Sequence, residues 1–438
     1  VFEQEAEEFL DGLLNGKSLE EVQRDGYAIK LLPRVTRKEE REVTPQQLEV
    51  LMNALGKATF VPSRAPEMIP GGYAIRGRNT LRSGTELIEI LDSKLPAQWT
   101  AQVSLLPELE VDEDSAIDGD SVLLLLDNDF EPTTSRILFS FSTATALITT
   151  FLFAVGCFGA NENVAQHMQE LTEAGDYSGV NWFNGELAQV LLPLGFIQVM
   201  HELGHLLVAR RDKFKTAPPT LLPFWFLPYL GAKTDIKTSP QDLTSLFDFA
   251  FMGPFLGLFT SAIFLFTGLQ STLLADATAS QYFPTIPVSL LQLSTLGGSI
   301  VDNFFGGTGI INLQDPSNTL NLHPFALAGF CGMMLNSLEL LPLGSTDGGR
   351  LSQALFGRAT HSIIGGATWL TLLVSSFLLP NHDVLIGVWA VYKIVQNDME
   401  IPCRNEVDDV NIPRSLAAFG LWFVAILAIT PMSVEGLL

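Results

Sequence analysis

The sequence predicts a polytopic α-helical membrane protein that carries a soluble α/β domain at its N-terminus. Of its 438 residues, 47% are hydrophobic and only 17% are charged, which is too apolar for an ordinary soluble enzyme. Charged residues concentrate in the first 135 positions, and long apolar runs interrupt the rest of the chain. We therefore divide the chain into a soluble domain over residues 1–135 and a transmembrane domain over residues 136–438.

The predicted N-terminal domain mixes helical and strand patterns. The spacing of apolar residues predicts helices over Glu3–Asn15, Pro45–Leu55 and Thr85–Lys94, and strands over Gly72–Arg76 and Ser121–Leu126. The second strand is nearly all leucine and should therefore be buried. The stretch before it, Glu108–Asp120, is acidic and is expected to form a solvated loop.

Seven apolar runs follow Arg136, and most approach the length of about 20 residues that crosses a bilayer as a helix. They cover residues 137–158, 184–210, 247–269, 324–345, 361–380, 382–397 and 414–432. The sixth run is the shortest and contains Lys393. Residues 284–304 form an amphipathic stretch with glycines that we expect to be interfacial or re-entrant.

The distribution of lysine and arginine orients these spans. All 25 basic residues fall within 1–136, 210–246, 346–360 and 393–414, which alternating spans place on one side of the membrane or at its edge. The loops on the other side, 159–183 and 270–323, contain none. Because basic loops stay on the cytosolic side, the N-terminal domain is expected in the cytosol or in the equivalent compartment of an organelle.

The second apolar run contains the motif His201-Glu202-Leu203-Gly204-His205. On a helix this spacing puts both imidazoles one turn apart on the same face. An ionisable residue inside a span costs about 2.5–3.5 kcal/mol on insertion scales, so it needs a partner or a function. We predict that His201 and His205 bind zinc and that Glu202 is the general base, which takes a proton from the zinc-bound water.

A third zinc ligand should come from another segment, because catalytic zinc usually takes three protein ligands and one water. Asp347 is the candidate, since both it and the histidines approach the side of the membrane that holds the basic loops. His201 precedes Arg210 by nine residues, which is roughly 13 Å of helix. The alternative is that Asp347 is only a turn aspartate before Gly348.

The segment that leads to Asp347 also holds the candidate substrate-positioning residues Asn336, Pro342 and Gly348. Pro342 and Gly344 should break the helix, which frees backbone groups to line a wet cavity or to pair with an extended substrate. Asn336 has two possible partners, which are the backbone of a substrate and a neighbouring helix.

These motifs resemble the site-2 protease class of intramembrane zinc metalloproteases, which pairs a membrane-embedded His-Glu-x-x-His with a distant Asn-x-x-Pro…Asp-Gly segment. We expect that second segment here between Asn336 and Gly348. Within that class, the chain is similar to the plastid and cyanobacterial branch called ethylene-dependent gravitropism-deficient and yellow-green proteins. The stretches that carry this closer match are Gly231–Thr238, Phe247–Pro254 and Leu322–Gly329. Thr346 departs from the pattern, since leucine is common there, but it leaves the carboxylate of Asp347 in place.

The resemblance implies a function and a location. It implies zinc as the cofactor, hydrolysis of peptide bonds in membrane-spanning or membrane-adjacent substrates, and a chloroplast membrane, either thylakoid or envelope. In that setting the lipid bilayer and membrane-protein substrates are the expected partners, and the N-terminal domain faces the stroma. Members of this branch that lack the His-Glu-x-x-His are thought to be inactive, whereas this chain keeps it.

Composition argues against two other kinds of protein. A net charge of −23 disfavours a nucleic-acid partner, which needs a basic face. The three cysteines, Cys157, Cys331 and Cys403, are scattered and predict neither a disulfide framework nor a cysteine zinc site.

Two alternatives to the protease remain open. One is a zinc-binding, transporter-like membrane protein, and the other is a catalytically silent scaffold that binds membrane partners. Transporters usually spread acidic residues over several spans, whereas the runs 137–158, 361–380 and 414–432 contain no carboxylate. The intact Glu202 between the two histidines argues against the scaffold.

Overall fold

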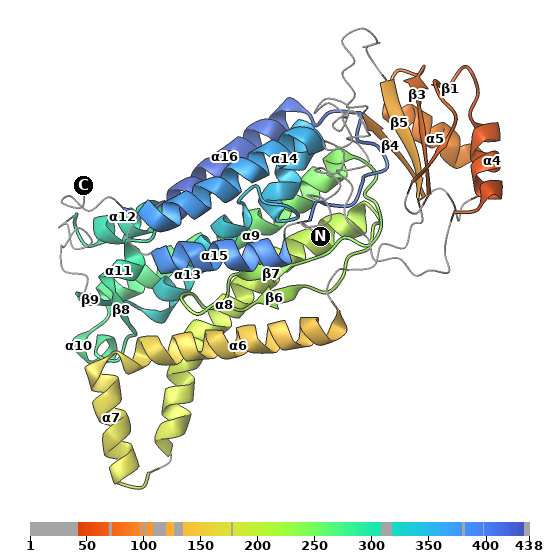
Figure 1. Cartoon of the computed structure of the whole chain (residues 1–438). Coiled ribbons are helices and arrows are strands. Elements are labelled where there is room, and N and C mark those ends of the chain that lie inside the picture. The colour runs from red at the N-terminus through yellow and green to blue at the C-terminus, as the bar shows by residue number, and fades with distance from the viewer. Residues whose placement is uncertain are drawn as a thin grey trace, which may run out of the picture.

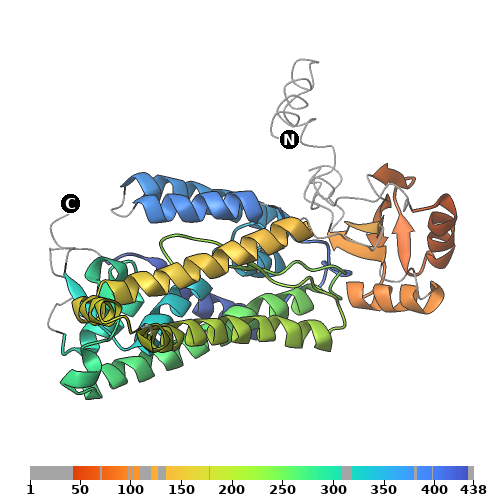
Figure 2. The same ribbon diagram turned by 90° about the horizontal axis from the view of Figure 1, so that it is seen from below.

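The structure, a computed structural model, describes most of the chain from residue 43 onward. The described residues are 43–69, 72–96, 99, 102–107, 120–126, 135–176, 178–307, 318–378, 382–396 and 398–432. The predicted helix Glu3–Asn15 and nearly all of the acidic stretch Glu108–Asp120 lie outside them. Figures 1 and 2 show an α/β unit at one end of an elongated bundle of helices.

The α/β unit is an antiparallel sheet packed against two helices. Its strands are β1 (Phe60–Pro62), β2 (Glu67–Ile69), β3 (Gly72–Asn79), β4 (Val103–Pro107) and β5 (Asp120–Leu126), in the order β1-β3-β5-β4 with β2 also on β3. The helices are α4 (Pro45–Ala54) and α5 (Gly84–Lys94). Leucines from both helices, including Leu51 and Leu91, share a core with Leu105 and Leu123 from the sheet.

The helices and strands predicted within the described part of this unit are confirmed, with small shifts at their ends. Helix α4 begins at Pro45 because the Thr44 side chain accepts a hydrogen bond from the Gln47 amide and the Gln47 side chain accepts one from the Thr44 amide. Strand β5 is buried from Val122 to Leu126, as its run of leucines predicts. The domain boundary after residue 135 stays a prediction.

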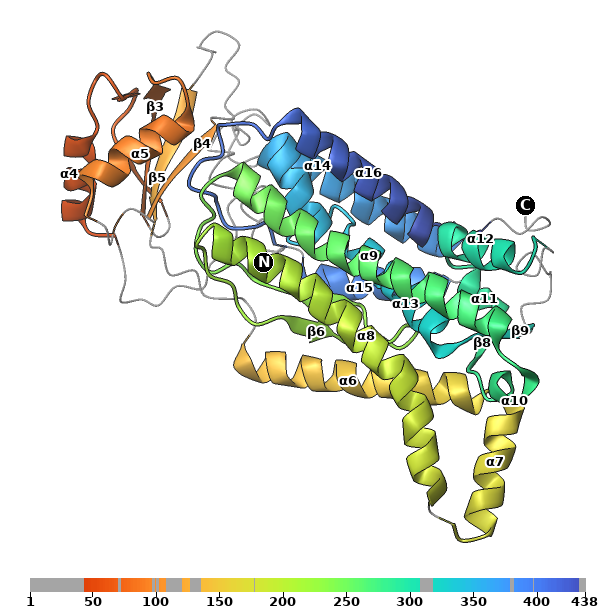
Figure 3. The same cartoon turned by 180° about the vertical axis from the view of Figure 1, so that it is seen from behind.

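The rest of the chain is a helix bundle. Its main helices are α6 (Arg136–Gly159), α7 (Glu162–Glu173), α8 (Ser178–Arg211), α9 (Leu243–Leu274), α13 (Pro324–Glu339), α14 (Asp347–Leu378), α15 (His382–Val395) and α16 (Ile412–Ile429). Within the described residues, five helices are long and apolar enough to cross a membrane, namely α6, α8 from Asn181 onward, α9, α14 and α16. Figure 3 shows α8 beside α9, and α14 beside α16.

The predicted span over residues 324–345 is wrong as a single helix. Helix α13 ends at Glu339, residues 341–346 form turns, and α14 begins at Asp347. Pro342 lacks the amide hydrogen that a helix needs, and Gly344 has a positive φ of 42°. Helix α13 is almost entirely buried among α8, α9 and α16, so its apolar character reflects the interior of the bundle rather than contact with lipid.

The count of seven spans is therefore not confirmed. Helix α15 has 14 residues, which is shorter than a spanning helix. The predicted run 361–380 lies within α14, which starts earlier and changes direction at Gly357, where φ is 77°. The segment 284–304 contains β8 (Thr285–Pro287), α11 (Val288–Leu291) and the ten-residue α12 (Thr295–Phe304), all too short to cross a bilayer.

Two short strands form an antiparallel pair at the far end of the bundle. Strand β8 pairs with β9 (Thr319–Asn321), and the short helix α10 (Ala277–Ser280) precedes them. Figure 1 shows these elements with α11 and α12 at the end of the bundle opposite the α/β unit.

A β-hairpin lies inside the bundle, beside α8. It consists of β6 (Thr220–Leu222) and β7 (Gly231–Lys233), and it packs against α6 and α13. Hydroxyl groups of α6 satisfy carbonyls of this connection: Ser142 donates to Leu221 O at 2.7 Å, and Thr150 donates to Pro228 O at 2.8 Å. Irregular backbone is tolerated at membrane depth when the surrounding protein satisfies it in this way.

Residues 398–411, between α15 and α16, join the two parts of the molecule, and we call them the docking segment. Arg404 O accepts the amide hydrogen of Leu105 in β4 at 2.8 Å, while the Arg404 amide donates to Pro240 O at 2.8 Å. The Arg404 guanidinium also pairs with Asp92 of α5. The docking segment thus lies between the edge of the sheet and the residues that precede α9.

Candidate metal centre

Helix α8 places two histidines side by side in the middle of the bundle. His201 and His205 are both buried, and their Nε2 atoms lie 2.9 Å apart. The one-turn spacing predicted from the sequence therefore produces the expected pair on one helix face.

Hydrogen bonds on the other ring nitrogens fix the orientation of both histidines. His201 Nδ1 donates to Asn336 Oδ1 at 2.7 Å, and the Asn336 amide nitrogen donates to Gly332 O at 2.7 Å. His205 Nδ1 donates to Phe249 O at 2.9 Å. Because a carbonyl only accepts, a hydrogen resides on each Nδ1, and in the neutral form of each ring Nε2 carries the lone pair that can bind a metal.

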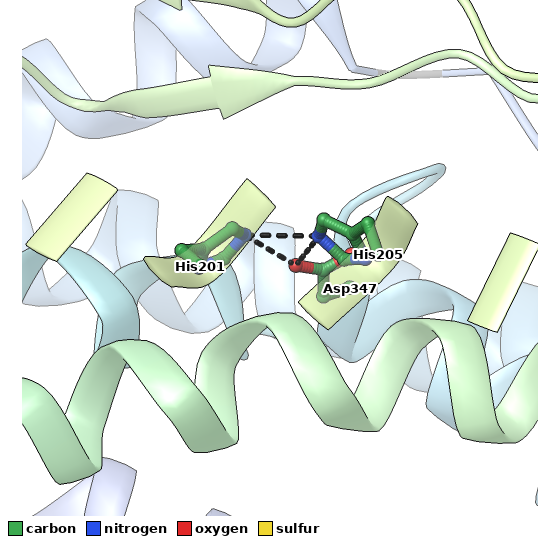
Figure 4. A group of neighbouring side chains, drawn as sticks. All are labelled: His201, His205 and Asp347. Carbon is green, nitrogen blue, oxygen red and sulfur yellow. Dashed lines mark hydrogen bonds and ion pairs between the residues drawn. The ribbon is translucent and has the colours of Figure 1, made fainter. Parts of the chain in front are cut away.

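Asp347 completes this group from the first residue of α14. Its Oδ2 atom lies 3.3 Å from the Nε2 atoms of both His201 and His205. Among the described residues, Oδ2 has no hydrogen-bond partner although it is buried. Figure 4 shows the three side chains pointing toward one another, with the histidines on one helix and the aspartate on another.

This arrangement fits a metal ion. Three atoms that can act as ligands converge with separations of 2.9, 3.3 and 3.3 Å, close enough to bind one cation between them. Tetrahedral zinc with ligand bonds of about 2.0–2.2 Å sets its ligands roughly 3.3–3.5 Å apart. Two imidazole nitrogens and one carboxylate are a known donor set for catalytic zinc.

Glu202 lies beside the histidines and keeps partial exposure. Its Oε1 atom accepts a hydrogen bond from Gln198 at 3.0 Å, and its Oε2 atom accepts one from the Thr234 hydroxyl at 2.9 Å. Thr234 follows β7 directly, so the hairpin inside the bundle holds the glutamate from the side opposite its own helix.

Glycines allow the helices to approach closely at this site. A Cβ atom on Gly253 of α9 would lie 2.4 Å from His205 Nε2, and one on Gly257 would lie 1.8 Å from Asn336 Oδ1. On α8, a Cβ atom on Gly204 would lie 2.4 Å from Met252 O. Helix α9 can therefore pack directly behind the histidines only because these positions have no side chain.

The three predicted substrate-positioning residues are not gathered around one point. Asn336 contacts His201, which favours the neighbouring-helix role over contact with a substrate. Gly348 is buried against the backbone, because a Cβ atom there would lie 1.9 Å from Leu340 O. Pro342 is half-buried in the turn between α13 and α14. A role of these residues in binding substrate stays a prediction.

Sequence reasoning missed Glu339, the last residue of α13. Its Oε2 atom lies 3.4 Å from His201 Nε2, and its Oε1 atom accepts a hydrogen bond from the Ala232 amide of β7. Two signals were available: an acidic residue inside an apolar run, which points to function, and its place three residues before Pro342. In the pattern Asn-x-x-Pro of the site-2 class, Glu339 rather than Asn336 occupies the first position.

A buried His-His-Asp centre on helices of an apolar bundle, with a glutamate next to the first histidine, defines a site-2-type zinc metalloprotease domain. Residues 189–379 match the model of Peptidase family M50. The resemblance drawn from the sequence is confirmed.

Curated relatives carry the same class of name. The chain is 30% identical over 245 residues to "Probable zinc metalloprotease EGY1, chloroplastic" of Oryza sativa subsp. japonica, covering 54% of this chain and 39% of that protein. It is 30% identical over 250 residues to the EGY1 protein of Arabidopsis thaliana, covering 55% and 43%. "Probable zinc metalloprotease EGY2, chloroplastic" of Arabidopsis thaliana is 26% identical over 235 residues, covering 51% and 39%.

These matches span about two fifths of the length of the curated relatives. No solved structure matches the chain. The relatives are named zinc metalloproteases, and the three convergent donor atoms fit that ion, so zinc is the cofactor of this domain.

Proposed function

We propose that the chain is an intramembrane zinc endopeptidase that hydrolyses peptide bonds of membrane-spanning or membrane-adjacent substrates. The observation that supports this most is the convergence of His201, His205 and Asp347 inside an apolar helix bundle, with Glu202 at their side. On the outer face of α8, Val199 and Leu206 flank the site and are exposed, as side chains in contact with lipid would be.

The residues of the site suit peptide hydrolysis. Zinc, when bound, polarises a peptide carbonyl and lowers the pKa of a water ligand. Glu202 is held by Gln198 and Thr234, and no arginine or lysine in the described part of the chain forms an ion pair with it. In this role Glu202 takes the proton of the attacking water and passes it to the leaving nitrogen. Helix α9, packed behind the histidines, excludes water from the rear of the site.

We infer a chloroplast membrane as the location, with the lipid bilayer and membrane proteins as partners. The support is the word chloroplastic in the names of the relatives together with the five apolar helices found among the described residues. Residues 159–183 and 270–323, which follow α6 and end α9 at the far end of the bundle, contain no lysine or arginine, and this supports a stromal position for the α/β unit at the other end.

The experiment that tests the proposal compares Glu202→Gln with the wild-type chain, both purified and reconstituted with a membrane-spanning substrate. We expect zinc to remain bound and cleavage to fall by about 10²–10⁴-fold, the usual contribution of a general base. Glu186→Gln is the matched control, because Glu186 is also on α8 and also accepts a hydrogen bond from a glutamine, Gln189, but lies outside the site. It should cleave like the wild type.

Full cleavage by the Glu202→Gln variant would remove Glu202 from the mechanism. The membrane peptides that accumulate when the protein is missing are the candidate substrates. A wild-type chain that binds zinc but cleaves none of these peptides would favour the scaffold alternative. Zinc movement across sealed vesicles, unaffected by Glu202→Gln, would favour the transporter-like alternative. His205→Ala should lose bound zinc in metal analysis, since it removes one of three donors.

A further inference from the structure

A buried arginine lies directly behind the metal centre and contacts several parts of it. Arg350 follows Asp347 by one turn at the start of α14 and is only 2% exposed. Its Nη1 atom lies 3.3 Å from Asp347 Oδ1, and its Nη2 atom donates to Thr234 O at 2.7 Å. The guanidinium also lies over the ring of Phe249, 5.3 Å from the ring centroid.

Each of these contacts leads to a residue with a role in the site. The contact to Oδ1 of Asp347 leaves Oδ2 directed at the two histidines. The Thr234 hydroxyl donates to Glu202, so a fixed Thr234 backbone fixes the position of the base. The Phe249 carbonyl accepts the Nδ1 hydrogen of His205. The Arg350 guanidinium therefore contacts Asp347 directly. It also contacts Thr234, which holds Glu202, and Phe249, which holds His205.

A second carboxylate, Glu400 of the docking segment, holds the arginine in place. Arg350 Nε donates to Glu400 Oε2 at 2.7 Å, and Glu400 Oε1 accepts the amide hydrogen of Ile401 at 2.8 Å. A buried cation must be paired, or its desolvation is strongly destabilising. Because Glu400 supplies the short ion pair, the longer contact to Asp347 orients that carboxylate while leaving its charge available for a metal.

We propose that Arg350, held by Glu400, is the positioning residue of the metal centre: it aims the Asp347 carboxylate and fixes Thr234 against Glu202. This inference rests on the proposed function. Lysine cannot replace Arg350, because a single ammonium group lacks the planar fork that reaches Asp347, Thr234 and Glu400 at once. Partners that orient metal ligands typically change metal affinity by about 10–100-fold when they are altered.

The test measures zinc affinity in the full chain by competition with a chromophoric chelator, together with the melting temperature. We expect Arg350→Lys to bind zinc about 10–100-fold more weakly than the wild type, and Glu400→Gln about tenfold more weakly. Substituting cobalt for zinc gives a second readout, since a misaligned carboxylate changes the visible absorption of the metal. A purely structural role would leave that spectrum unchanged in the folded variant.

Arg358→Lys is the matched control. Arg358 is also buried on α14, makes a two-point ion pair with Glu406 of the docking segment, and donates to the Glu400 carbonyl. The groups that hold it, the Glu406 carboxylate and the Glu400 carbonyl, are not predicted zinc ligands. We expect its zinc affinity to stay within about twofold of the wild type, since no ligand loses a partner.

Three outcomes would overturn the positioning role. The first is a zinc affinity of Arg350→Lys equal to that of the wild type. The second is a loss of zinc affinity in Arg358→Lys as large as that in Arg350→Lys. The third is a cobalt spectrum that is unchanged in both Arg350→Lys and Glu400→Gln. If Arg350→Lys does not fold, Glu400→Gln decides, because glutamine keeps the shape of the side chain. A wild-type chain that binds zinc but cleaves nothing would refute the proposed function, and the affinity comparison would still test the positioning role.

Discussion

His201 Nδ1 donates a hydrogen bond of 2.7 Å to Asn336 Oδ1, and this links the first predicted zinc ligand to the internal helix α13. The Asn336 amide nitrogen is itself fixed by Gly332 O, so the amide cannot turn over without losing one of the two bonds. Asn336 thereby selects the histidine tautomer that leaves Nε2 free for a metal.

Asn336→Ala should weaken zinc binding, because the Nδ1 hydrogen of His201 loses its acceptor and the ring loses its orientation. The expected loss is about 10–100-fold in affinity, measured by chelator competition. Ser337→Ala is the control, since Ser337 is the next residue and is equally buried but has no hydrogen bond from its hydroxyl among the described residues. Unchanged zinc affinity with a raised KM would instead support contact between Asn336 and substrate.

Gly253→Ala should abolish zinc binding without altering any ligand. The new methyl group would lie 2.4 Å from His205 Nε2, so either the ring or helix α9 has to move. The control is Gly195→Ala on α8, where a Cβ atom meets nothing within 4 Å. That change should keep zinc and raise stability by up to about 1 kcal/mol, the difference in helix propensity. Metal analysis and thermal unfolding of both variants check this.

Glu339→Gln should bind zinc about tenfold more weakly while remaining folded. Glutamine keeps an oxygen to accept the Ala232 amide hydrogen, but it cannot ionise, so it removes a group 3.4 Å from His201 Nε2 that could carry a negative charge beside a bound cation. Glu339→Leu removes both features and should also lower the melting temperature. Zinc binding as tight as that of the wild type in Glu339→Gln would show that the carboxylate acts only through the hairpin.

The docking of the α/β unit should weaken in acid through Asp408. Burial raises the pKa of this carboxyl, but hydrogen bonds from the Gly84 and Thr85 amides, the Thr85 hydroxyl and Asn405 outweigh it and hold the pKa below its ordinary value of 3.8. A lowered pKa in the folded state means that the stabilisation is complete above the ordinary pKa. It is lost as the pH falls through the lowered value.

Limited proteolysis between the sheet and α6 as a function of pH measures this effect. The wild type should become more sensitive below about pH 4, and Asp408→Asn should be equally sensitive at pH 7 and in acid. Asp409→Asn, at the exposed neighbour, should behave like the wild type. A wild-type profile in Asp408→Asn would contradict the docking role of this carboxylate.

The approach of His201, His205 and Asp347 to one another could be predicted in part, because the spacing of the two histidines is local, and their role as zinc ligands stays a prediction. His201 and His205 are one turn apart on any helix, and an aspartate before two glycines at the end of an apolar run is rare enough to stand out. The apolar run 324–345 misled because hydrophobicity does not distinguish a helix buried in protein from one that contacts lipid. The break that the sequence predicts at Pro342 and Gly344 is the local signal against a single span.

Other parts of the site depend on contacts between distant segments and left little local signal. Arg350 and Glu400 are 50 positions apart, and neither lies in a pattern that pairs it with the other. The docking segment has no helical or strand periodicity, because its hydrogen bonds go to β4 and to residues 240–242. Such pairings arise only when the whole chain is folded.

The junction between α8 and α14 has a consequence for how the protein is made. Here two imidazoles of α8 face a carboxylate of α14, and a bound cation would hold the two helices together at this point. Bound zinc would link two regions that are nearly 150 positions apart in the chain. Newly synthesised copies that meet a poor supply of zinc should assemble slowly and be degraded early, so the amount of protein in the membrane should follow the availability of this ion.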